Sequence, residues 1–247
     1  MNNELIEPRI IQFQAHCRGV LHRNKKVLEL CDVSEIDIDI PKLQECLTNG
    51  YFTPYRMEYY KSTSTQNLNL EDGFMEFITA DCLSGKRVGE GHCPIDITKN
   101  DFGIDVLCVC LNGTYTNEKS IMQNFSKCGN NLDTLFEKNQ FQEALNIYIT
   151  EYYNKLLSAK KTKNLNKLYY CAFISTNMHV YIAVFKINLD SIANIKYDKV
   201  SKQLKSIKFH GFIGDQYGTT ILFKSKKRLE IRLHKDILKS PYVVQLI

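Results

Sequence analysis

Long apolar runs are missing from this 247-residue chain, and so are the short motifs of several common enzyme classes. No stretch approaches the roughly 20 apolar residues that span a bilayer. The first residues carry acids and a proline and do not resemble a signal peptide. No G-x-S-x-G, Walker A loop or H-E-x-x-H supports a named hydrolase or nucleotide-binding class. We therefore expect a cytoplasmic protein with no membrane partner.

The nine cysteines show no recognisable pairing. Their number is odd, no C-x-x-C occurs, and the six histidines do not accompany them at the spacing of a zinc site. Cys108 and Cys110 share one expected strand, in which residues i and i+2 point to the same face. We expect buried, reduced thiols rather than zinc ligands or disulfides.

Charge is unevenly distributed along a chain of ordinary globular composition. Apolar residues make up 44% and charged residues 24%, and the length allows one large domain or two small ones. The net charge is +5. Residues 196–239 hold twelve Lys and Arg against four acids, whereas the remainder holds 20 against 23. A mildly acidic body with a basic C-terminal part fits a polyanionic partner, although a solvated lysine face would give the same pattern.

Hydrophobic periodicity predicts a mixture of helices and strands. Helices are expected over residues 1–31, from Pro41 to about 47, over 70–85 with an apolar stripe that includes Phe77, and over 130–161. Strands are expected over residues 34–40, 93–97, 103–111, 167–176, 178–187, 206–213, 219–225 and 228–233.

This mixture predicts an α/β (α+β) protein in which helices flank a mixed central β-sheet. We expect residues 1–165 to form a helical N-terminal part and a core, and residues 166–247 to form an additional β-rich, basic part. The boundary, near 165 or 195, is soft, and a single domain is the alternative.

One segment, residues 103–120, gathers the groups that phosphodiester cleavage requires. Asp105 opens an apolar strand, Asn112-Gly113 is a strong hairpin signal, and Asn117-Glu118-Lys119 lies on the return arm. Such cleavage needs a metal that activates water and neutralises charge on the phosphate. Carboxylates suit Mg²⁺, and a nearby lysine orients the water and stabilises the developing anion.

Asp105 followed by Asn117-Glu118-Lys119 resembles the PD-(D/E)xK nuclease superfamily, particularly type II restriction endonucleases. The resemblance covers about residues 70–125, and some members carry Asn in the first position of the triplet. A preceding helix often donates another acid, and Glu76 stands where that acid would fall. The resemblance implies a restriction-endonuclease-like core, one or two Mg²⁺ ions bound by Asp105 together with Glu118 or Asn117, and a catalytic set of Asp105, Glu118, Lys119, Asn117 and Glu76.

The same resemblance implies the partners. The substrate would be double-stranded DNA cut at a specific short site, and a cognate DNA methyltransferase would protect the host's own sites. Many relatives act as dimers and some as monomers, so a homodimer is one option. A nucleic-acid-binding protein without catalysis and a protein unrelated to nucleic acid are the alternatives.

The return arm of the hairpin allows several geometries. A strict two-residue loop on Asn-Gly puts Asp105 and Glu118 on one face of the hairpin. A bulge or a longer loop would instead align Asn117 and Lys119 with Asp105. Residues 116–127 also fit a helix with its N-cap at the first or second position.

A competing alignment uses Pro94-Ile95-Asp96 as the first element and Asp105-Val106-Leu107 as the second. It keeps Asp96 as a candidate metal ligand but leaves no lysine at the required position, so Lys99 would have to substitute. Asp105 belongs to both alignments and is the firmest candidate.

The basic C-terminal part supplies the candidate DNA contacts. Lysine binds phosphate as a point charge, whereas arginine also reads guanine edges. Alternation in the segment RLEIRL places its charged residues on one face and its apolar residues on the other. The expected DNA-binding residues are Lys224, Lys226, Lys227, Arg228, Arg232, Gln216 and Tyr217, with Lys86 and Arg87 as weaker candidates.

Overall fold

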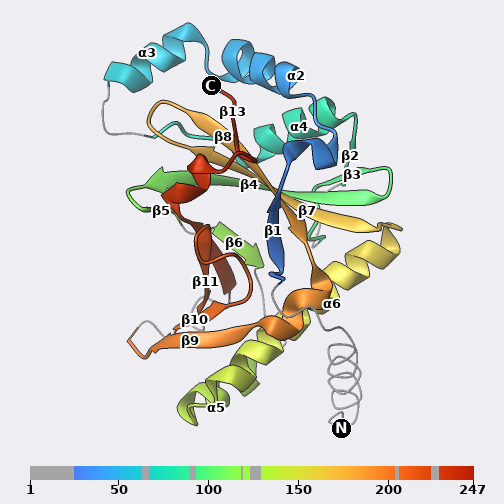
Figure 1. The fold of residues 1–247 in the computed structure, drawn as a ribbon, viewed down its shortest axis with the longest axis vertical. Coiled ribbons are helices and arrows are strands. Elements are labelled where there is room, and N and C mark those ends of the chain that lie inside the picture. Colours follow the sequence, from blue (N-terminus) through green and yellow to red (C-terminus); the bar gives the residue numbers. More distant parts are fainter. Residues whose placement is uncertain are drawn as a thin grey trace.

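The computed structural model describes residues 25–62, 67–88, 93–117, 119–122, 129–203, 206–223 and 228–247. Within those ranges the chain forms two β-sheets and a set of helices (Figure 1). Every helix there is too short or too polar to cross a lipid bilayer. The mixed α+β class predicted from the sequence is confirmed.

The larger sheet has eight strands of mixed direction. In spatial order it contains β1 (Leu28–Cys31), β8 (Val180–Ile187), β7 (Lys167–Ser175), β4 (Phe102–Asn112), β3 (Ile97–Lys99) and β2 (Lys86–Arg87), while β13 (Val244–Gln245) also pairs with β8 and β5 (Tyr115–Thr116) with β4. β4 and β7 run parallel, and the other neighbours are antiparallel. We call this the main sheet.

The second sheet is antiparallel and has five strands, in the order β6 (Lys119–Met122), β12 (Arg228–Leu233), β11 (Gly218–Phe223), β10 (Ser206–His210) and β9 (Lys196–Ser201). The chain passes from the main sheet to the second sheet between β5 and β6. Because β7 and β8 lie beside β1 and β4, the main sheet takes strands from both sides of residue 165. A boundary there does not separate the two sheets.

Helices cover both faces of the main sheet (Figure 1). α6 (Phe141–Thr162) packs on one face together with the second sheet, and α5 (Gly129–Glu137) precedes it. The opposite face carries α2 (Ile40–Glu45), α3 (Pro54–Ser62) and α4 (Asp72–Leu83). The shorter helices are η1 (Val33–Ile36), η2 (Cys46–Tyr51), η4 (Leu189–Asn194) and η5 (Lys235–Lys239).

β4 shows how the strand pattern produces this layering. Leu107 and Val109 point into the core shared with α6, and Ile104 and Val106 point into the core shared with α4. Successive side chains of a strand alternate between faces, so a strand buried on both sides reads as an almost continuous apolar run.

Several expected elements are confirmed, with changes at their ends. Pro41 lies in the first turn of α2, and α4 ends at Leu83, followed by Ser84 in the left-handed conformation. The long helix expected over 130–161 is two helices, because Asn139 adopts a φ of 57° between them. The polar residue at this bend stops α5 and lets the chain restart as α6.

Three expectations about the N-terminal half are wrong. Leu28–Cys31 is a strand rather than the end of a helix, and the rest of that helix, residues 1–24, lies outside the described residues. Val33–Ile36 forms a 3₁₀ helix where a strand was expected, because the Asp32 side chain accepts a hydrogen bond from the Ser34 N–H and starts a turn. Phe77 is 57% exposed and does not belong to the buried stripe of α4.

Candidate active site

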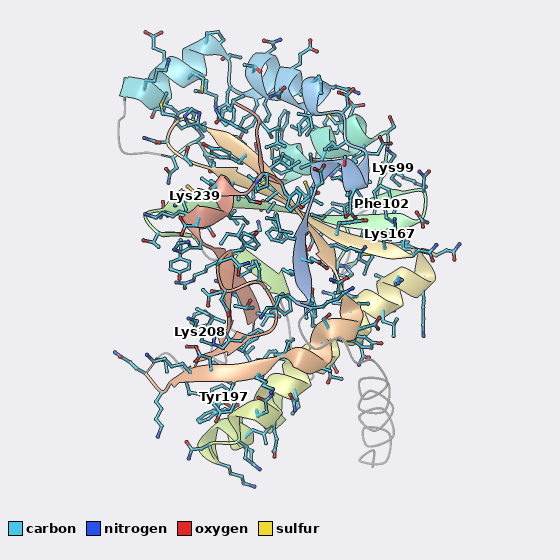
Figure 2. The ribbon with its side chains drawn as sticks, viewed as in Figure 1. Lys99, Phe102, Lys167, Tyr197, Lys208 and Lys239 are labelled. Carbon is cyan, nitrogen blue, oxygen red and sulfur yellow. The ribbon has the colours of Figure 1, made fainter. Side chains whose placement is uncertain are left out.

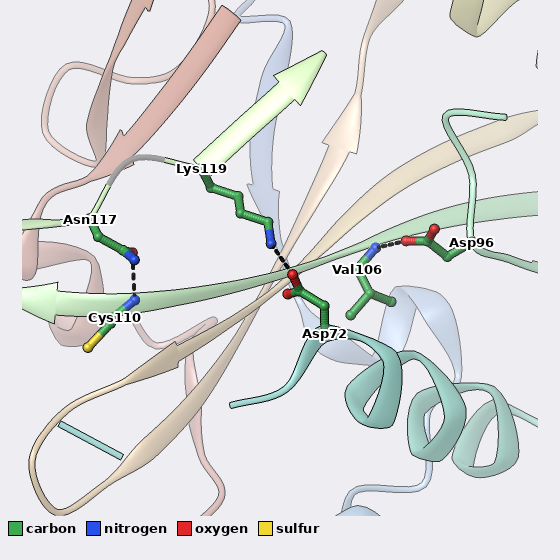
Figure 3. Close-up of polar contacts among 6 residues, drawn as sticks. All are labelled: Asp72, Asp96, Val106, Cys110, Asn117 and Lys119. Atoms are coloured by element: carbon green, nitrogen blue, oxygen red, sulfur yellow. Dashed lines mark hydrogen bonds and ion pairs between the residues drawn. The ribbon is translucent and has the colours of Figure 1, made fainter. Parts of the chain in front are cut away.

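The candidate site lies where the edge of β4 loses its neighbouring strand. β3 pairs with β4 as far as Ile97 opposite Ile104, and β5 resumes the pairing with Thr116 opposite Leu111. Between these two paired positions, side chains replace the missing strand (Figure 3). The Val106 N–H donates to the Asp96 carboxylate at 2.7 Å, and the Cys110 N–H donates to the Asn117 side-chain oxygen at 2.8 Å.

Close packing brings Asp96 to this edge. Asp96 donates its backbone N–H to the Ile104 carbonyl at 2.9 Å, and Ile95 packs against Gly103. A Cβ at residue 103 would lie 2.9 Å from the Ile95 side chain and 2.8 Å from that of Leu165. Glycine is therefore the residue that lets the chain before β3 approach β4 so closely.

Asp105 and Asp96 form a pair of interacting carboxyl groups. Burial raises the pKa of Asp105 well above its usual value, and the neighbouring Asp96 carboxyl raises it further. Behind Asp105, Tyr170 occupies the register position opposite it on β7. The hydroxyl of this buried tyrosine lies 3.1 Å from that of Tyr152 on α6. Two carboxylates this close repel one another unless a proton or a cation compensates their charge.

Lys119 supplies positive charge on the flank of this pair. It is the first residue of β6, and its side-chain amine contacts the Asp72 carboxylate at 2.6 Å (Figure 3). The charge of Lys119 lowers the pKa of Asp105, opposing the effects of burial and Asp96. Lys119 thus approaches the Asp96–Asp105 pair from the second sheet, while Asp72 approaches from the first turn of α4.

Glu76 completes the group of acids. Burial raises the pKa of Glu76, and the Asp96 carboxylate adds to that rise. Arg87 on β2 counters it through an ion pair of 3.6 Å. Four residues separate Asp72 from Glu76, so both side chains lie on the same side of α4.

The structure therefore brings together four of the residues singled out in the sequence: Asp105, Asp96, Glu76 and Lys119. The side chain of Asn117 accepts a hydrogen bond from the backbone of β4. Glu118 lies outside the described residues. Lys99, the substitute in the competing alignment, instead forms an ion pair of 2.7 Å with Asp37.

The hairpin has the expected two-residue loop, shifted by one position, and not the alternative bulge or longer loop. Tyr115 lies opposite Asn112, so the turn consists of Gly113, with a φ of 68°, and Thr114. The return arm stays with β4 only through Asn117 and then joins β12 as β6. Residues 119–122 are a strand, which contradicts the alternative of a helix over 116–127 for the part that is described. The remaining positions, 123–127, lie outside the described residues.

Asp72 was missed by sequence reasoning. Its first-turn position in α4 has an ordinary explanation, because an acid there interacts favourably with the helix dipole. The signal that identifies it is its spacing of four residues from Glu76, which places the two acids on one helical face.

The candidate DNA-binding residues are spread over several surfaces. Arg228 forms an ion pair with Glu230, which is fully buried, so this arginine has a structural partner. Gln216 is exposed, whereas Tyr217 packs partly into the core and its carbonyl accepts from the His234 N–H. Lys86 and Arg87 are exposed on β2, beside the candidate active site. Lys224, Lys226 and Lys227 lie outside the described residues.

Strand pairing reveals two adjacent lysines that the sequence did not single out. Lys199 on β9 lies opposite Lys208 on β10 (Figure 2 labels Lys208), and beyond these two lysines the same row of paired residues holds the apolar Ile221 and the buried acid Glu230. Arg228 and Arg232 share this face by alternation. The other face of the same strands is buried in the core, so we call the face with Lys199, Lys208, Arg228 and Arg232 the outer face of the second sheet. Glu230 and Phe223, on the same face, are buried.

The donor set fits a hard divalent cation. Among the described residues, no group of three or more His, Cys, Asp and Glu side chains is arranged as a metal site. Mg²⁺, however, is usually held by only one or two carboxylates and keeps several waters. The adjoining carboxyls of Asp96 and Asp105 meet that requirement, and Asp96 is close enough to Glu76 to raise the pKa of that acid.

No protein-family model, curated protein or solved structure matches the chain. Function is therefore inferred from the chemistry of the site.

Proposed function

We propose that this protein is a cytoplasmic, Mg²⁺-dependent endodeoxyribonuclease of the type II restriction kind, which cleaves double-stranded DNA at a specific short site. The observation that carries the proposal is the Asp96–Asp105 carboxyl pair with Lys119 on its flank, at an open strand edge. Paired carboxylates with a neighbouring lysine are the groups that metal-assisted phosphodiester hydrolysis requires.

In the proposed reaction, Asp96 and Asp105 would hold one or two Mg²⁺ ions, with Glu76 as a further acid. When bound, the cation supplies charge neutralisation at the phosphate and a lower pKa for water. Lys119 orients the attacking water and stabilises the extra negative charge on the phosphate. The water oxygen forms a bond to phosphorus and gives up a proton to solvent, the bond from phosphorus to the leaving sugar oxygen breaks, and that oxygen takes up a proton from solvent.

The outer face of the second sheet would contact the DNA backbone. Arg228 and Arg232 share this face with Lys199 and Lys208, and phosphates attract such a surface without regard to sequence. We further propose that a cognate methyltransferase protects the host's sites. A homodimer would place two such centres on the two strands of a symmetric site.

The decisive experiment incubates the purified protein with unmethylated phage DNA and Mg²⁺. We expect discrete DNA fragments that disappear with EDTA and with Asp105→Ala. Asp81→Asn is the matched control, because it removes an acid from the same helix as Glu76, where Asp81 forms an exposed ion pair with Lys42.

Intact DNA across several substrates and divalent metals would contradict nuclease activity. If the protein then still bound DNA with a steep salt dependence, a non-catalytic nucleic-acid-binding role would replace the proposal. The cations on the outer face of the second sheet favour this second candidate over a function unrelated to nucleic acid.

A further inference from the structure

The Lys119–Asp72 ion pair connects three separate elements at the open edge of β4. Lys119 comes from β6 and Asp72 from the start of α4, and both lie beside the strand that carries Asp105 (Figure 3). The amine and carboxylate are 2.6 Å apart. The Lys119 side chain is only 25% exposed, against 51% for Asp72, so the amine is held within the site rather than extended into solvent.

Asp72 gives this amine a different partner from the Asp96–Asp105 pair. Lys119 is close enough to interact electrostatically with Asp105, yet the acid that its amine contacts is Asp72. Two adjoining carboxylates attract any cation, and an amine tethered to the same chain has a high effective concentration near them. Without Asp72, Lys119 would compete with a divalent cation for Asp96 and Asp105.

We propose that Asp72 is a positioning residue that draws the Lys119 amine away from the Asp96–Asp105 pair, so that the pair stays open to a divalent cation. The same ion pair keeps the amine on the flank of the two acids, where a bound phosphate would meet it. This inference rests on the proposed function, because it takes Asp96 and Asp105 as the metal-binding groups. Asp72 itself touches neither the metal nor the substrate.

The test is a double-mutant cycle read by metal binding, with no DNA present. Mn²⁺ is titrated into the wild type, Asp72→Asn, Lys119→Gln and the double variant, and free Mn²⁺ is counted by electron paramagnetic resonance. We expect Asp72→Asn to weaken Mn²⁺ binding about tenfold, because the released lysine pairs with the two acids. Adding Lys119→Gln to that variant should restore at least wild-type affinity, because the competitor is gone.

Two further variants separate this role from helix stability. Asp72→Glu keeps the carboxylate and should bind Mn²⁺ nearly as well as the wild type. Asp81→Asn breaks the 2.8 Å ion pair between Asp81 and Lys42 on the same helix and should leave Mn²⁺ affinity unchanged. Thermal unfolding of each variant shows whether Asp72→Asn has lost its fold, in which case the Asp72→Glu and double variants carry the test.

Each remaining outcome overturns a definite claim. Unchanged Mn²⁺ affinity in Asp72→Asn would overturn the positioning role, and so would a double variant as weak as Asp72→Asn, since Asp72 would then be a metal ligand itself. A wild type that binds Mn²⁺ but cuts no DNA would overturn the nuclease proposal while leaving the positioning role intact. A wild type that binds no Mn²⁺ would overturn both.

Discussion

At the scale of single residues, the charged form of the Asp105 carboxyl destabilises the folded protein unless a cation or a proton compensates its charge. Burial and the Asp96 carboxyl both raise its pKa in the folded protein above the ordinary value of 3.8. The folded state therefore binds a proton more tightly than the unfolded state does. The contribution of Asp105 to stability is therefore most favourable at low pH and declines as the pH rises from the unfolded pKa through the raised folded pKa.

Asp105→Asn should therefore stabilise the metal-free protein at neutral pH. The gain should be about 1.4 kcal/mol for each unit by which the folded pKa is raised, because the amide has no charge to desolvate. Urea unfolding with EDTA, from about pH 5 to about pH 8, measures it, and the advantage of the variant should grow with pH across that window.

Asp81→Asn is the control for this measurement, since Asp81 is an exposed acid that forms an ion pair with Lys42. It should show no comparable gain at any pH. Equal stability of Asp105→Asn and the wild type at the upper end of the pH range would mean that the charge of Asp105 does not destabilise the folded protein.

At the scale of elements, Asp96 acts as a substitute for a missing strand. Its carboxylate accepts the Val106 N–H at 2.7 Å, where β3 has separated from β4. A backbone N–H left without an acceptor in a partly buried position costs about 1–3 kcal/mol. The same side chain therefore supports the sheet edge and contributes a carboxyl to the site.

Asp96→Ala and Asp96→Asn separate these two roles. Both remove the charge beside Asp105, but only asparagine retains an oxygen that accepts from the Val106 N–H. We expect the alanine variant to be less stable than the asparagine variant by about 1–3 kcal/mol in chemical denaturation without metal. We also expect both to lose divalent-cation binding. Equal stability of the two variants would show that water replaces the carboxylate at the strand edge.

Elements with strong local signals were predictable from the sequence, and those fixed by distant partners were not. α4 and the buried strands followed from periodicity and from β-branched and aromatic content. The apolar stretch Leu28–Cys31 reads equally well as part of a helix. It is a strand because β8, more than 150 residues away, offers it an edge.

For the candidate site, most of the residues could be predicted from the sequence, but the way in which the fold brings them together could not. Asp105 and Asp96 were found because they lie in or beside segments expected to be strands, but their pairing depends on the close approach of Ile95 to Gly103. Lys119 was expected to lie on a hairpin arm beside β4 and instead reaches the site from the second sheet. A change of sheet within a few residues leaves no periodic signal, because both arms remain extended.

At the scale of the whole molecule, the connection from β5 to β6 joins the two parts that the proposed function needs. The hairpin begins on the strand of Asp105 and ends in the sheet whose outer face carries cations. Lys119 pairs with Ile231, whose side chain faces the core, so Lys119 lies on the face of this sheet opposite the cations. The proposed binding surface and the proposed catalytic lysine belong to one sheet.

The outer face of the second sheet gives the last prediction. Lys199 and Lys208 lie directly opposite one another on β9 and β10, which costs stability in the free protein because like charges repel across strands. Lys199→Gln/Lys208→Gln should therefore fold at least as stably as the wild type. Without divalent metal, its DNA affinity should fall, and the slope of log affinity against log salt should decrease by about 0.9 for each phosphate that the variant no longer neutralises.

Lys42→Gln/Lys61→Gln is the matched control, since it removes two lysines from α2 and α3, at the opposite end of the molecule from β9 and β10 (Figure 1). Fluorescence anisotropy over a series of salt concentrations measures both slopes. If both double variants reduced the slope equally, the cations on the outer face would contribute only to overall charge, and the DNA would have to bind elsewhere. A reduction confined to Lys199→Gln/Lys208→Gln would place the phosphate backbone on the sheet that carries Lys119, because β9, β10 and β6 belong to one continuous set of paired strands.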